Sequence, residues 1–484
     1  MRARRLMVLG TGSDVGKSLL VAGLCRAYAR RGLKVAPFKA QNMSNNAAVT
    51  VDGGEIGRAQ ALQARASGLA PVTDMNPVLL KPDTDVTAQV VVQGRVHARL
   101  SAADYQRRKP ALRPRVVESL DRLSEGRDLV LIEGAGSGAE RYLRPQDISN
   151  MGLATAADLP AVLLADDSRG GVTAAVLGHH LLWTPAERAR VAGVIVNKFR
   201  GDPAIFAPAA EDIRQATGWP VLGLLRWSEA ARALPAEDSL ALDAARAPGR
   251  GLVIAVPELP RMANADDLDP LAAEPGVDLR WVRPGHPLPA EAAAVVLPGS
   301  KSTRAALDAL RAEGWDIDLR AHIRRGGRVV GICAGFQMLG RRVRDPDGIE
   351  GPPGETEGLG LLDIDTVIGP SKRLSEIAAL DAISGTRVSG YEMHMGVTAG
   401  AGLRRPWLSL DGRPEGALSP DGRVGGTYLH GIFGSGAFRA QWLRALGGAG
   451  SAEDHAARIE TMLDRLADGI EADLDLDALL DLAR

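Results

Sequence analysis

The chain has 484 residues, more than one ordinary hydrophobic core accommodates, so two or three domains are expected. Lys and Arg number 58 against 59 for Asp and Glu, and aromatic residues make up 4 %, so neither charge nor composition favours nucleic acid as a partner. The two cysteines do not suit a disulfide scaffold, and the apolar runs are too short for a membrane span, which together predict a cytoplasmic protein.

The first half of the sequence alternates short apolar runs with amphipathic helical stretches. This pattern is typical of a parallel sheet with crossover helices. It predicts one doubly wound α/β domain over residues 1–235, with helices near 18–31 and 111–125. The expected strands are 6–9, 34–38, 129–132, 161–165, 193–196 and 221–224.

The stretch Gly10-Thr-Gly-Ser-Asp-Val-Gly-Lys-Ser18 lies between the first predicted strand and the first predicted helix. This is the context of a phosphate-binding loop, because backbone N–H groups and a helix N-terminus face the phosphates while Lys17 neutralises their charge. Gly12, Gly16, Lys17 and Ser18 are therefore expected to bind ATP, and the Ser18 hydroxyl to bind Mg²⁺. Five residues separate Gly10 from Gly16 where the usual pattern has four, so the loop is a lengthened variant.

Polar side chains follow other predicted strands of this domain. Glu133 ends a strand, and a carboxylate at that edge of a parallel sheet is expected to bind Mg²⁺ opposite Ser18. Asn197 and Lys198 end another strand and suit contacts with the nucleotide. Lys39 is expected to meet either the γ-phosphate or a substrate carboxylate. The amide and hydroxyl residues that follow Lys39 are expected to form a solvated loop for the most part.

The second half of the sequence starts a new alternation after a segment rich in Ala, Pro and charge. We expect a linker at 236–250, a second α/β domain at 251–445 and a C-terminal helical tail at 446–484. The strands expected in the second domain are 252–257, 279–282, 294–297, 328–331, 360–365 and 425–430.

Cys333 ends a short apolar strand, and a helix is expected to begin at Ala334. A tight turn with small neighbours exposes the sulfur, and the helix N-terminus favours its thiolate, so Cys333 is predicted to be a nucleophile that attacks a carbonyl group. The N–H of Ala334 is placed to bind the developing oxyanion, and a second donor is expected from Gly299 or Ser300 at another strand end. Cys25, in the middle of a predicted helix, is expected to be a buried structural cysteine.

A thiol nucleophile requires a base, and His430 is the favoured candidate because a predicted strand runs through it into a glycine turn. His394 is the alternative on residue type alone. A complete triad also needs a carboxylate to orient the histidine. Class I glutaminases usually have Glu two residues after the histidine, where this chain has Ile432. The orienting group is therefore left unassigned.

The lengthened loop, the Glu133-Gly-Ala-Gly sequence and the pair Cys333 and His430 together resemble the cobyric acid synthase family, glutamine-hydrolysing amidases of cobalamin synthesis. The resemblance covers residues 7–436. Its most specific motifs are Lys39-Ala-Gln-Asn-Met-Ser-Asn-Asn46, Asp147-Ile-Ser-Asn-Met-Gly152, Arg169-Gly-Gly171, Val196-Asn-Lys-Phe-Arg-Gly-Asp202, Leu297-Pro-Gly-Ser-Lys301, Gly390-Tyr-Glu-Met-His-Met-Gly396 and Tyr428-Leu-His-Gly431.

This resemblance implies an α/β fold in which a P-loop domain of the dethiobiotin synthetase type precedes a class I glutamine amidotransferase domain. Members of this branch lack the acid after the histidine, so Ile432 is expected. The chain departs from the family pattern at Ser168, where a second Asp is common before Arg-Gly-Gly, and at Ala334 and Phe336, where Gly and Tyr are usual.

The resemblance also implies the reaction. Cys333 would release ammonia from glutamine through a thioester. Mg-ATP would convert a propionate carboxylate of adenosylcobyrinic acid a,c-diamide into an acyl phosphate, and ammonia would turn it into an amide, in turn at positions b, d, e and g. ATP and Mg²⁺ are the expected cofactors, glutamine and a corrinoid the expected partners, and Lys39 and Arg169 the expected contacts for substrate carboxylates.

Two alternatives stay open at this point. One is a cobyrinic acid a,c-diamide synthase, which has the same two domains and acts on the a and c carboxylates. The other is a regulatory P-loop ATPase joined to an inactive glutaminase-like module. The oligomeric state, the order of amidations and the presence of cobalt in the substrate are not predicted.

Overall fold

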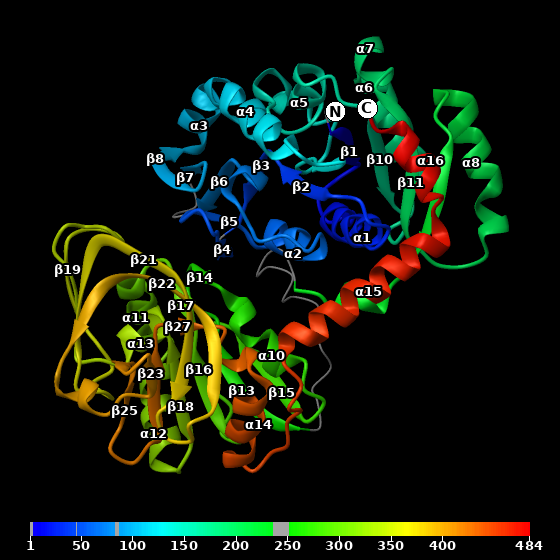
Figure 1. Ribbon diagram of the computed structural model, residues 1–484. Coiled ribbons are helices and arrows are strands. Elements are labelled where there is room, and N and C mark those ends of the chain that lie inside the picture. The colour runs from blue at the N-terminus through cyan, green and yellow to red at the C-terminus, as the bar shows by residue number, and fades with distance from the viewer. Residues whose placement is uncertain (1–2, 45, 83–86, 236–250) are drawn as a thin grey trace. The chain divides into compact units, whose positions relative to one another are not determined.

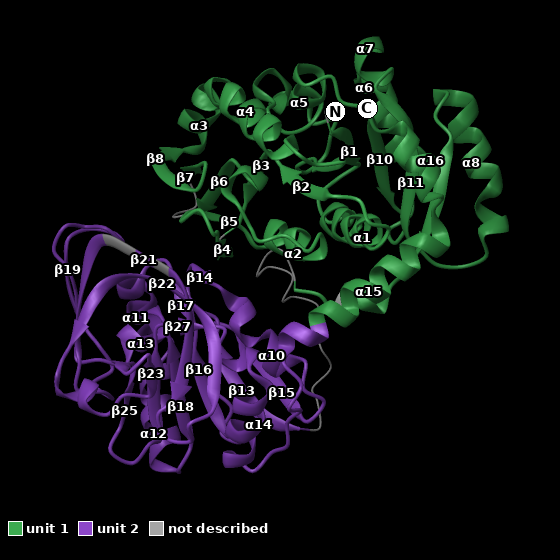
Figure 2. Ribbon diagram, in the orientation of Figure 1, with its two compact units in different colours: residues 1–237, 459–484 green, residues 238–458 purple. Residues whose placement is uncertain are grey.

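The computed structural model describes residues 3–44, 46–82, 87–235 and 251–484 (Figure 1). The chain forms two compact units (Figure 2). Unit 1 comprises Met1–Glu237 and Ile459–Arg484, and unit 2 comprises Asp238–Arg458. The predicted linker 236–250 lies outside the described residues. Among the residues that are described, no helix has both the length and the apolar character that a membrane span requires.

Within its described residues, unit 1 is built on a six-stranded parallel sheet with the order β12-β11-β10-β1-β9-β2. The strand order reverses beside β1: the chain crosses from β1 to the edge strand β2, returns to β9 between them, and then adds β10, β11 and β12 on the other side of β1. This confirms the predicted doubly wound domain, whose ligand crevice lies at the carboxyl ends of the strands on either side of the reversal. The strands are β1 Arg4–Gly10, β2 Val35–Lys39, β9 Leu129–Glu133, β10 Ala161–Asp166, β11 Val191–Phe199 and β12 Val221–Arg226.

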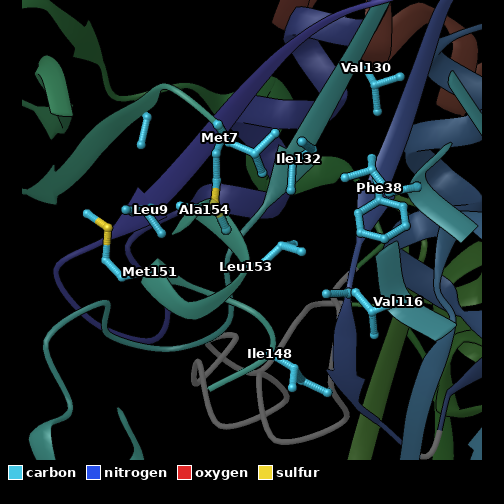
Figure 3. Close-up of a cluster of buried hydrophobic side chains, with 14 of the residues drawn as sticks. Met7, Leu9, Phe38, Val116, Val130, Ile132, Ile148, Met151, Leu153 and Ala154 are labelled. Carbon is cyan, nitrogen blue, oxygen red and sulfur yellow. The ribbon is translucent and has the colours of Figure 1, made fainter. Parts of the chain in front are cut away.

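Two apolar cores form because alternate residues of each strand point to opposite faces of the sheet. Met7 and Leu9 of β1 lie in one core, and Leu6 and Val8 lie in the other. Side chains from outside the sheet, such as Leu153 of the helix Met151–Ala156, pack in the first core (Figure 3). The helices of this unit are α1 Lys17–Arg30, α2 Arg58–Ala66, α3 Ala102–Arg108, α4 Arg113–Ser124, α5 Met151–Ala156, α6 Val172–Leu182, α7 Pro185–Arg188, α8 Pro203–Thr217 and α9 Glu229–Ala233.

The segment after β2 is more ordered than the solvated loop that the sequence predicts. Asn42, Ser44 and Asn46 are buried, with at most 4 % of each residue exposed. The reason is that this segment joins small sheets, in which its polar groups find partners: the Asn42 amide, for example, donates to Gln60. The strands are β3 Gln41–Met43, β4 Ala47–Val49, β5 Glu55–Gly57, β6 Val78–Pro82, β7 Thr87–Val92 and β8 Arg95–Ser101.

Unit 2 contains a second largely parallel sheet, with the order β15-β13-β16-β18-β26-β25 in its described part. Its strands are β13 Leu252–Pro257, β15 Val277–Val282, β16 Ala294–Leu297, β18 Arg328–Ile332, β25 Ala417–Leu418 and β26 Val424–Thr427, of which β25 is antiparallel. The helices are α10 Asp269–Ala272, α11 Thr303–Ala312, α12 Trp315–Arg324, α13 Ala334–Met338 and α14 Gly436–Ala445.

A mixed sheet adjoins this core and was not predicted. It is dominated by the long antiparallel pair β21 Asp365–Asp381 and β22 Arg387–Ala399. The strand expected at 360–365 is wrong: Gly360 has a left-handed φ of 67°, and the regular strand begins only at Asp365. The sheet also contains β19 Arg342–Asp345, β20 Gly354–Glu357, β23 Leu408–Leu410, β24 Arg413–Glu415 and β27 Leu429–His430.

The C-terminal segment, predicted as one tail over 446–484, is divided between the units. Helix α15, His455–Asp473, begins in unit 2, whereas residues 459–484, including α16 Leu476–Leu482, belong to unit 1. Leu463, Leu466 and Ile470 are buried in the same core as α1. The approach is close, because a Cβ added to Gly23 of α1 would lie 2.2 Å from Ile470.

We predict that Leu463→Ala lowers the free energy of unfolding of unit 1 by about 2–5 kcal/mol, since the side chain is fully buried and a cavity would remain. Mass-spectrometric hydrogen exchange should show faster exchange in α1 and unchanged exchange in β13. Arg465→Ala, an exposed position on the same helix, is the control. Unchanged exchange in α1 of the Leu463 variant would contradict the assignment of α15 to the core of unit 1.

Candidate active sites

The phosphate-loop sequence forms the turn between β1 and α1. Gly16 precedes α1 with a φ of 99°, a left-handed conformation that favours glycine. Lys17 is 6 % exposed, and its ammonium group donates to the carbonyl oxygens of Gly12 (2.7 Å) and Gly136 (2.9 Å). A buried cation enclosed by a glycine-rich loop at a helix N-terminus is a site suited to an anionic group.

The side chains expected to bind the metal meet at the carboxyl ends of the strands. The Ser18 hydroxyl donates to Oε1 of Glu133 at 2.7 Å, and the Lys39 ammonium lies 2.8 Å from the same oxygen. Lys39 and Glu133 are register partners of the adjacent strands β2 and β9, which explains their contact. Glu133 has no exposed surface, so Lys39 neutralises a carboxylate that would otherwise be buried unpaired.

The other two residues expected to contact the nucleotide support the loop from the side of β11. The Asn197 amide donates to the Val15 carbonyl at 2.8 Å. Lys198 donates to the Asp14 carbonyl and forms a 2.7 Å ion pair with Asp166. Both side chains therefore contact the phosphate loop itself.

Ser168, which stands where the family commonly has Asp, hydrogen-bonds to Asp166 near the phosphate loop. Burial opposes ionisation of Asp166, but hydrogen bonds from Lys198 and Ser168 outweigh it and hold the pKa of Asp166 below its ordinary value. Arg169 lies in the exposed loop after β10. Lys39, the other residue expected to contact substrate, is buried at the end of β2.

In unit 2, Cys333 lies on a strained elbow between β18 and α13. Its φ of 55° and ψ of −110° are unusual for a residue with a side chain and cost of order 1–3 kcal/mol. The elbow depends on glycine, because a Cβ on Gly335 would lie 2.0 Å from the Leu297 carbonyl oxygen. The N–H of Ala334 lies in the first turn of α13, where no preceding carbonyl of the helix can accept it.

His430 is held beside this elbow by a carboxylate that the sequence did not identify. Its Nδ1 lies 2.7 Å from Oδ2 of Asp267, whose other oxygen accepts the Gly431 N–H at 2.7 Å. The ring also stacks on Tyr391, with centroids 5.0 Å apart. Asp267 comes from a short 3₁₀ turn, Ala265–Leu268, in a run of acidic residues without a distinguishing spacing, so no sequence signal marked it.

The electrostatics of this pair determine the protonation of the histidine. Burial disfavours the imidazolium, but the Asp267 carboxylate, bonded to the ring, and the nearby Cys333 sulfur outweigh burial and raise the pKa of His430 well above its ordinary value. The Cys333 thiol itself donates to the carbonyl oxygen of Met393 at 3.5 Å. The direction of this shift in the His430 pKa favours the imidazolium form of His430. An imidazolium beside a sulfur stabilises the thiolate, which is the nucleophilic form.

The alternative base is less suited to this role. His394 is 6 % exposed and stacks on Tyr428, with centroids 3.7 Å apart. Burial, with smaller contributions from Arg373 and His430, lowers its pKa to about 4, so it is neutral. The geometry thus favours His430 as the partner of Cys333.

A buried carboxylate fixes the strand that leads to His430. Glu415 accepts hydrogen bonds from the Thr427 hydroxyl (2.5 Å) and the Tyr428 N–H (2.7 Å), and burial raises the pKa of Glu415 to about 7. The Thr427 carbonyl in turn accepts the Cys333 N–H at 2.8 Å. Strand β26 therefore contacts the backbone of Cys333 on one side and leads directly into His430 on the other.

The residues predicted to supply the second oxyanion donor lie near His430. Gly299 and Ser300 form the short strand β17, which pairs with β14, Met262–Ala263. A Cβ on Gly299 would lie 3.6 Å from Cε1 of His430, so this backbone borders the ring. Cys25, by contrast, is fully buried in α1, and burial raises the pKa of its thiol to about 12, as expected for a structural cysteine.

Comparison with protein families identifies both halves of the chain. Residues 6–241 match the CobQ/CobB/MinD/ParA nucleotide binding domain, and residues 253–438 match the CobB/CobQ-like glutamine amidotransferase domain. These matches confirm the predicted order of a nucleotide-binding domain followed by a glutamine amidotransferase domain.

Curated relatives match over nearly their full length. A cobyric acid synthase of Cereibacter sphaeroides is 59% identical over 480 residues, with 99% of each chain covered. That of Paracoccus denitrificans is 59% identical over 479 residues, again with 99% of each chain covered. That of Bradyrhizobium diazoefficiens is 56% identical over 482 residues, with 100% of each chain covered.

We predict that Asp267→Asn slows alkylation of Cys333 by iodoacetamide at pH 7 by about tenfold, equivalent to about one pKa unit at His430. Without the carboxylate the pKa of His430 falls, less imidazolium faces the sulfur at neutral pH, and the alkylation profile moves to higher pH. The rate is measured by mass spectrometry of the Cys333 peptide. Asp266→Asn, which retains Asp267, is the control, and an unaltered profile in the Asp267 variant would show that the carboxylate does not act on the thiol.

Proposed function

This chain belongs to the cobyric acid synthase family, and on that premise we propose that it converts carboxylates of a corrinoid into amides, with glutamine as the nitrogen donor and ATP as the second substrate. The chain is an ATP-dependent, glutamine-hydrolysing amidoligase. The observation that carries the proposal is a full-length match to this family in a chain that holds both a phosphate loop and a Cys–His–Asp arrangement.

The finer assignment concerns the substrate. We take it to be adenosylcobyrinic acid a,c-diamide, amidated at the b, d, e and g carboxylates to give adenosylcobyric acid. The curated relatives at 55–59% identity carry the name cobyric acid synthase, which supports this choice over an enzyme acting at the a and c positions.

In unit 2, the geometry supports a thioester route to ammonia. The Cys333 sulfur attacks the side-chain amide carbon of glutamine, and the oxyanion accepts hydrogen bonds from the N–H of Ala334 and from Gly299 or Ser300. Because Asp267 engages Nδ1 of His430, Nε2 is the nitrogen that gives a proton to the departing ammonia. Water then attacks the thioester, His430 takes a proton from it, and glutamate leaves as the thiol is restored.

In unit 1, the residues suit transfer of the γ-phosphoryl group of ATP to a carboxylate. Lys17 and the N–H groups of the loop that includes Gly12 and Gly16 bind the β- and γ-phosphates. Lys39, at the adjacent strand end, lies where it can neutralise either the transferred phosphoryl group or the attacking carboxylate. The product is an acyl phosphate. Ammonia attacks its carbonyl carbon and displaces the phosphate, whereas a free carboxylate has no comparable leaving group.

The oxygen atoms of Ser18 and Glu133 fit magnesium. Hydroxyl and carboxylate oxygens are the ligands that this ion prefers, and it binds through one or two carboxylates while keeping waters and substrate phosphates. When bound, magnesium neutralises charge on the transferred phosphoryl group.

The remaining assignments rest on position alone. Asn197 and Lys198 are proposed to contact the nucleotide from the β11 side of the loop, and Arg169 to meet a carboxylate of the corrinoid. A regulatory ATPase with an inactive glutaminase-like module is disfavoured, because such a module has no need of a His430–Asp267 pair bonded beside Cys333.

The proposal is tested by supplying Mg-ATP and adenosylcobyrinic acid a,c-diamide with either glutamine or ammonium chloride, and counting amide groups by mass spectrometry. Cys333→Ala should abolish glutamine-dependent amidation and leave ammonia-dependent amidation, because only the first requires the thiol. Lys17→Ala should abolish both, because both require the acyl phosphate.

Cys25→Ala is the matched control, since it removes the other cysteine of the chain and should retain both reactions. Amidation at other positions, or none with this substrate, would contradict the assignment of the substrate. Release of glutamate by Cys333→Ala at the wild-type rate would contradict the thioester route.

A further inference from the structure

A glutamine beneath the phosphate loop joins three elements of unit 1. Gln63 of α2 has no exposed surface. Its Nε2 donates to Oε2 of Glu133 at 2.6 Å and to the carbonyl oxygen of Ser18 at 3.1 Å. The amide orientation follows from chemistry, since an ionised carboxylate only accepts hydrogen bonds and must therefore face the NH₂ group.

This orientation leaves the other end of the amide without a bond. Among the described residues no donor reaches Oε1 of Gln63, although the atom is buried. A buried acceptor without a partner costs about 1–3 kcal/mol, so an apolar side chain of similar length would serve better if the residue only filled space. A donor that arrives with a bound ligand would supply the missing partner of Oε1.

The surroundings restrict what that donor is. Gln63 is bonded to both residues proposed to bind magnesium, Ser18 through its carbonyl and Glu133 through its carboxylate. A magnesium ion at a phosphate loop keeps several of its water molecules, and each of these is a strong donor to a nearby carbonyl oxygen. Residues that bond the ligands of a metal ion typically alter its affinity by 10- to 100-fold when they are replaced.

We propose that Gln63 is a positioning residue of the magnesium site, with Nε2 fixing the Glu133 carboxylate and Oε1 accepting a hydrogen bond from a water molecule of the hydrated ion. This inference rests on the proposed function, which places magnesium between Ser18 and Glu133. It adds α2 as a third element of the site, beside α1 and β9.

The same helix supplies a matched control. Gln60 precedes Gln63 by one helical turn and is equally buried. Its Oε1 accepts from Asn42 at 2.9 Å, and the atom without a partner in the described residues is its donor Nε2, which has no use for a metal-bound water. Gln60 and Gln63 thus share burial, helix and side chain but differ in the polarity of the unbonded atom.

The test measures binding of Mn²⁺, a spectroscopic substitute for Mg²⁺, to the full-length protein saturated with ADP, by electron paramagnetic resonance of the free ion. Gln63→Met should weaken Mn²⁺ binding by about tenfold or more, whereas Gln60→Met should change it less than about twofold. ADP affinity without metal, measured by calorimetry, should be alike in all variants. Wild-type Mn²⁺ affinity in Gln63→Met would overturn the inference.

A second variant separates this role from packing and stays informative if Gln63→Met is unstable. Gln63→Glu places a second carboxylate against Glu133, so the Tm of this variant without metal should be lower than that of wild type. Mn²⁺ and ADP should then raise the Tm of the variant by more than they raise the Tm of wild type. An equal rise in both proteins would mean a packing role only and would overturn the inference. Glu133→Gln tests the premise that magnesium binds at this site. If Glu133→Gln binds Mn²⁺ as wild type does, the proposed magnesium site is wrong. If Glu133→Gln loses Mn²⁺ binding while Gln63→Met keeps wild-type affinity, the site stands and only the role of Gln63 is overturned.

Discussion

Parallel strands that share a sheet end at one edge, and this constraint places the reactive groups of both units. In unit 1 it brings Lys39 of β2 against Glu133 of β9, although 94 residues separate them, and sets both beside the loop that follows β1. In unit 2 it brings the end of β16, the Cys333 elbow after β18 and the end of β26 together. In each site, short turns at the strand ends then orient the reactive side chains.

Buried charge is the second common element of the two sites. Glu133 is paired with Lys39, and Asp267 with His430, in surroundings where a single charge would be costly. Removal of one partner takes away the charge that offsets the other, so a substitution at one residue also acts on the second. The pairing also sets protonation: the same Asp267 that is stabilised by His430 keeps the histidine charged, and hence favours the thiolate of Cys333.

The features predicted from sequence are those with strong local signals. The short apolar runs predicted the central strands of both sheets. The glycine-rich sequence up to Gly16 predicted the phosphate loop, and the small residues next to Cys333 predicted the elbow. Asp267 had no such signal, because a residue on a short 3₁₀ turn acts only through a contact made across the fold. The buried amides of Asn42 and Gln63 were missed for the same reason: their polar side chains suggest solvent exposure, and only long-range partners make burial favourable. The pair β21 and β22 was missed because Gly, Pro and charged residues interrupt its alternation.

The division of the C-terminal segment has a consequence for the order of folding. Because residues 459–484 complete a core begun by β1 and α1, unit 2 is an insertion within the sequence of unit 1. The backbone of Arg5 in β1 hydrogen-bonds to that of Arg484 at the far end of the chain. During synthesis the glutaminase half can therefore fold while the nucleotide-binding half still lacks residues 459–484. Strand β1 is made before unit 2 but belongs to the unit that is completed after it.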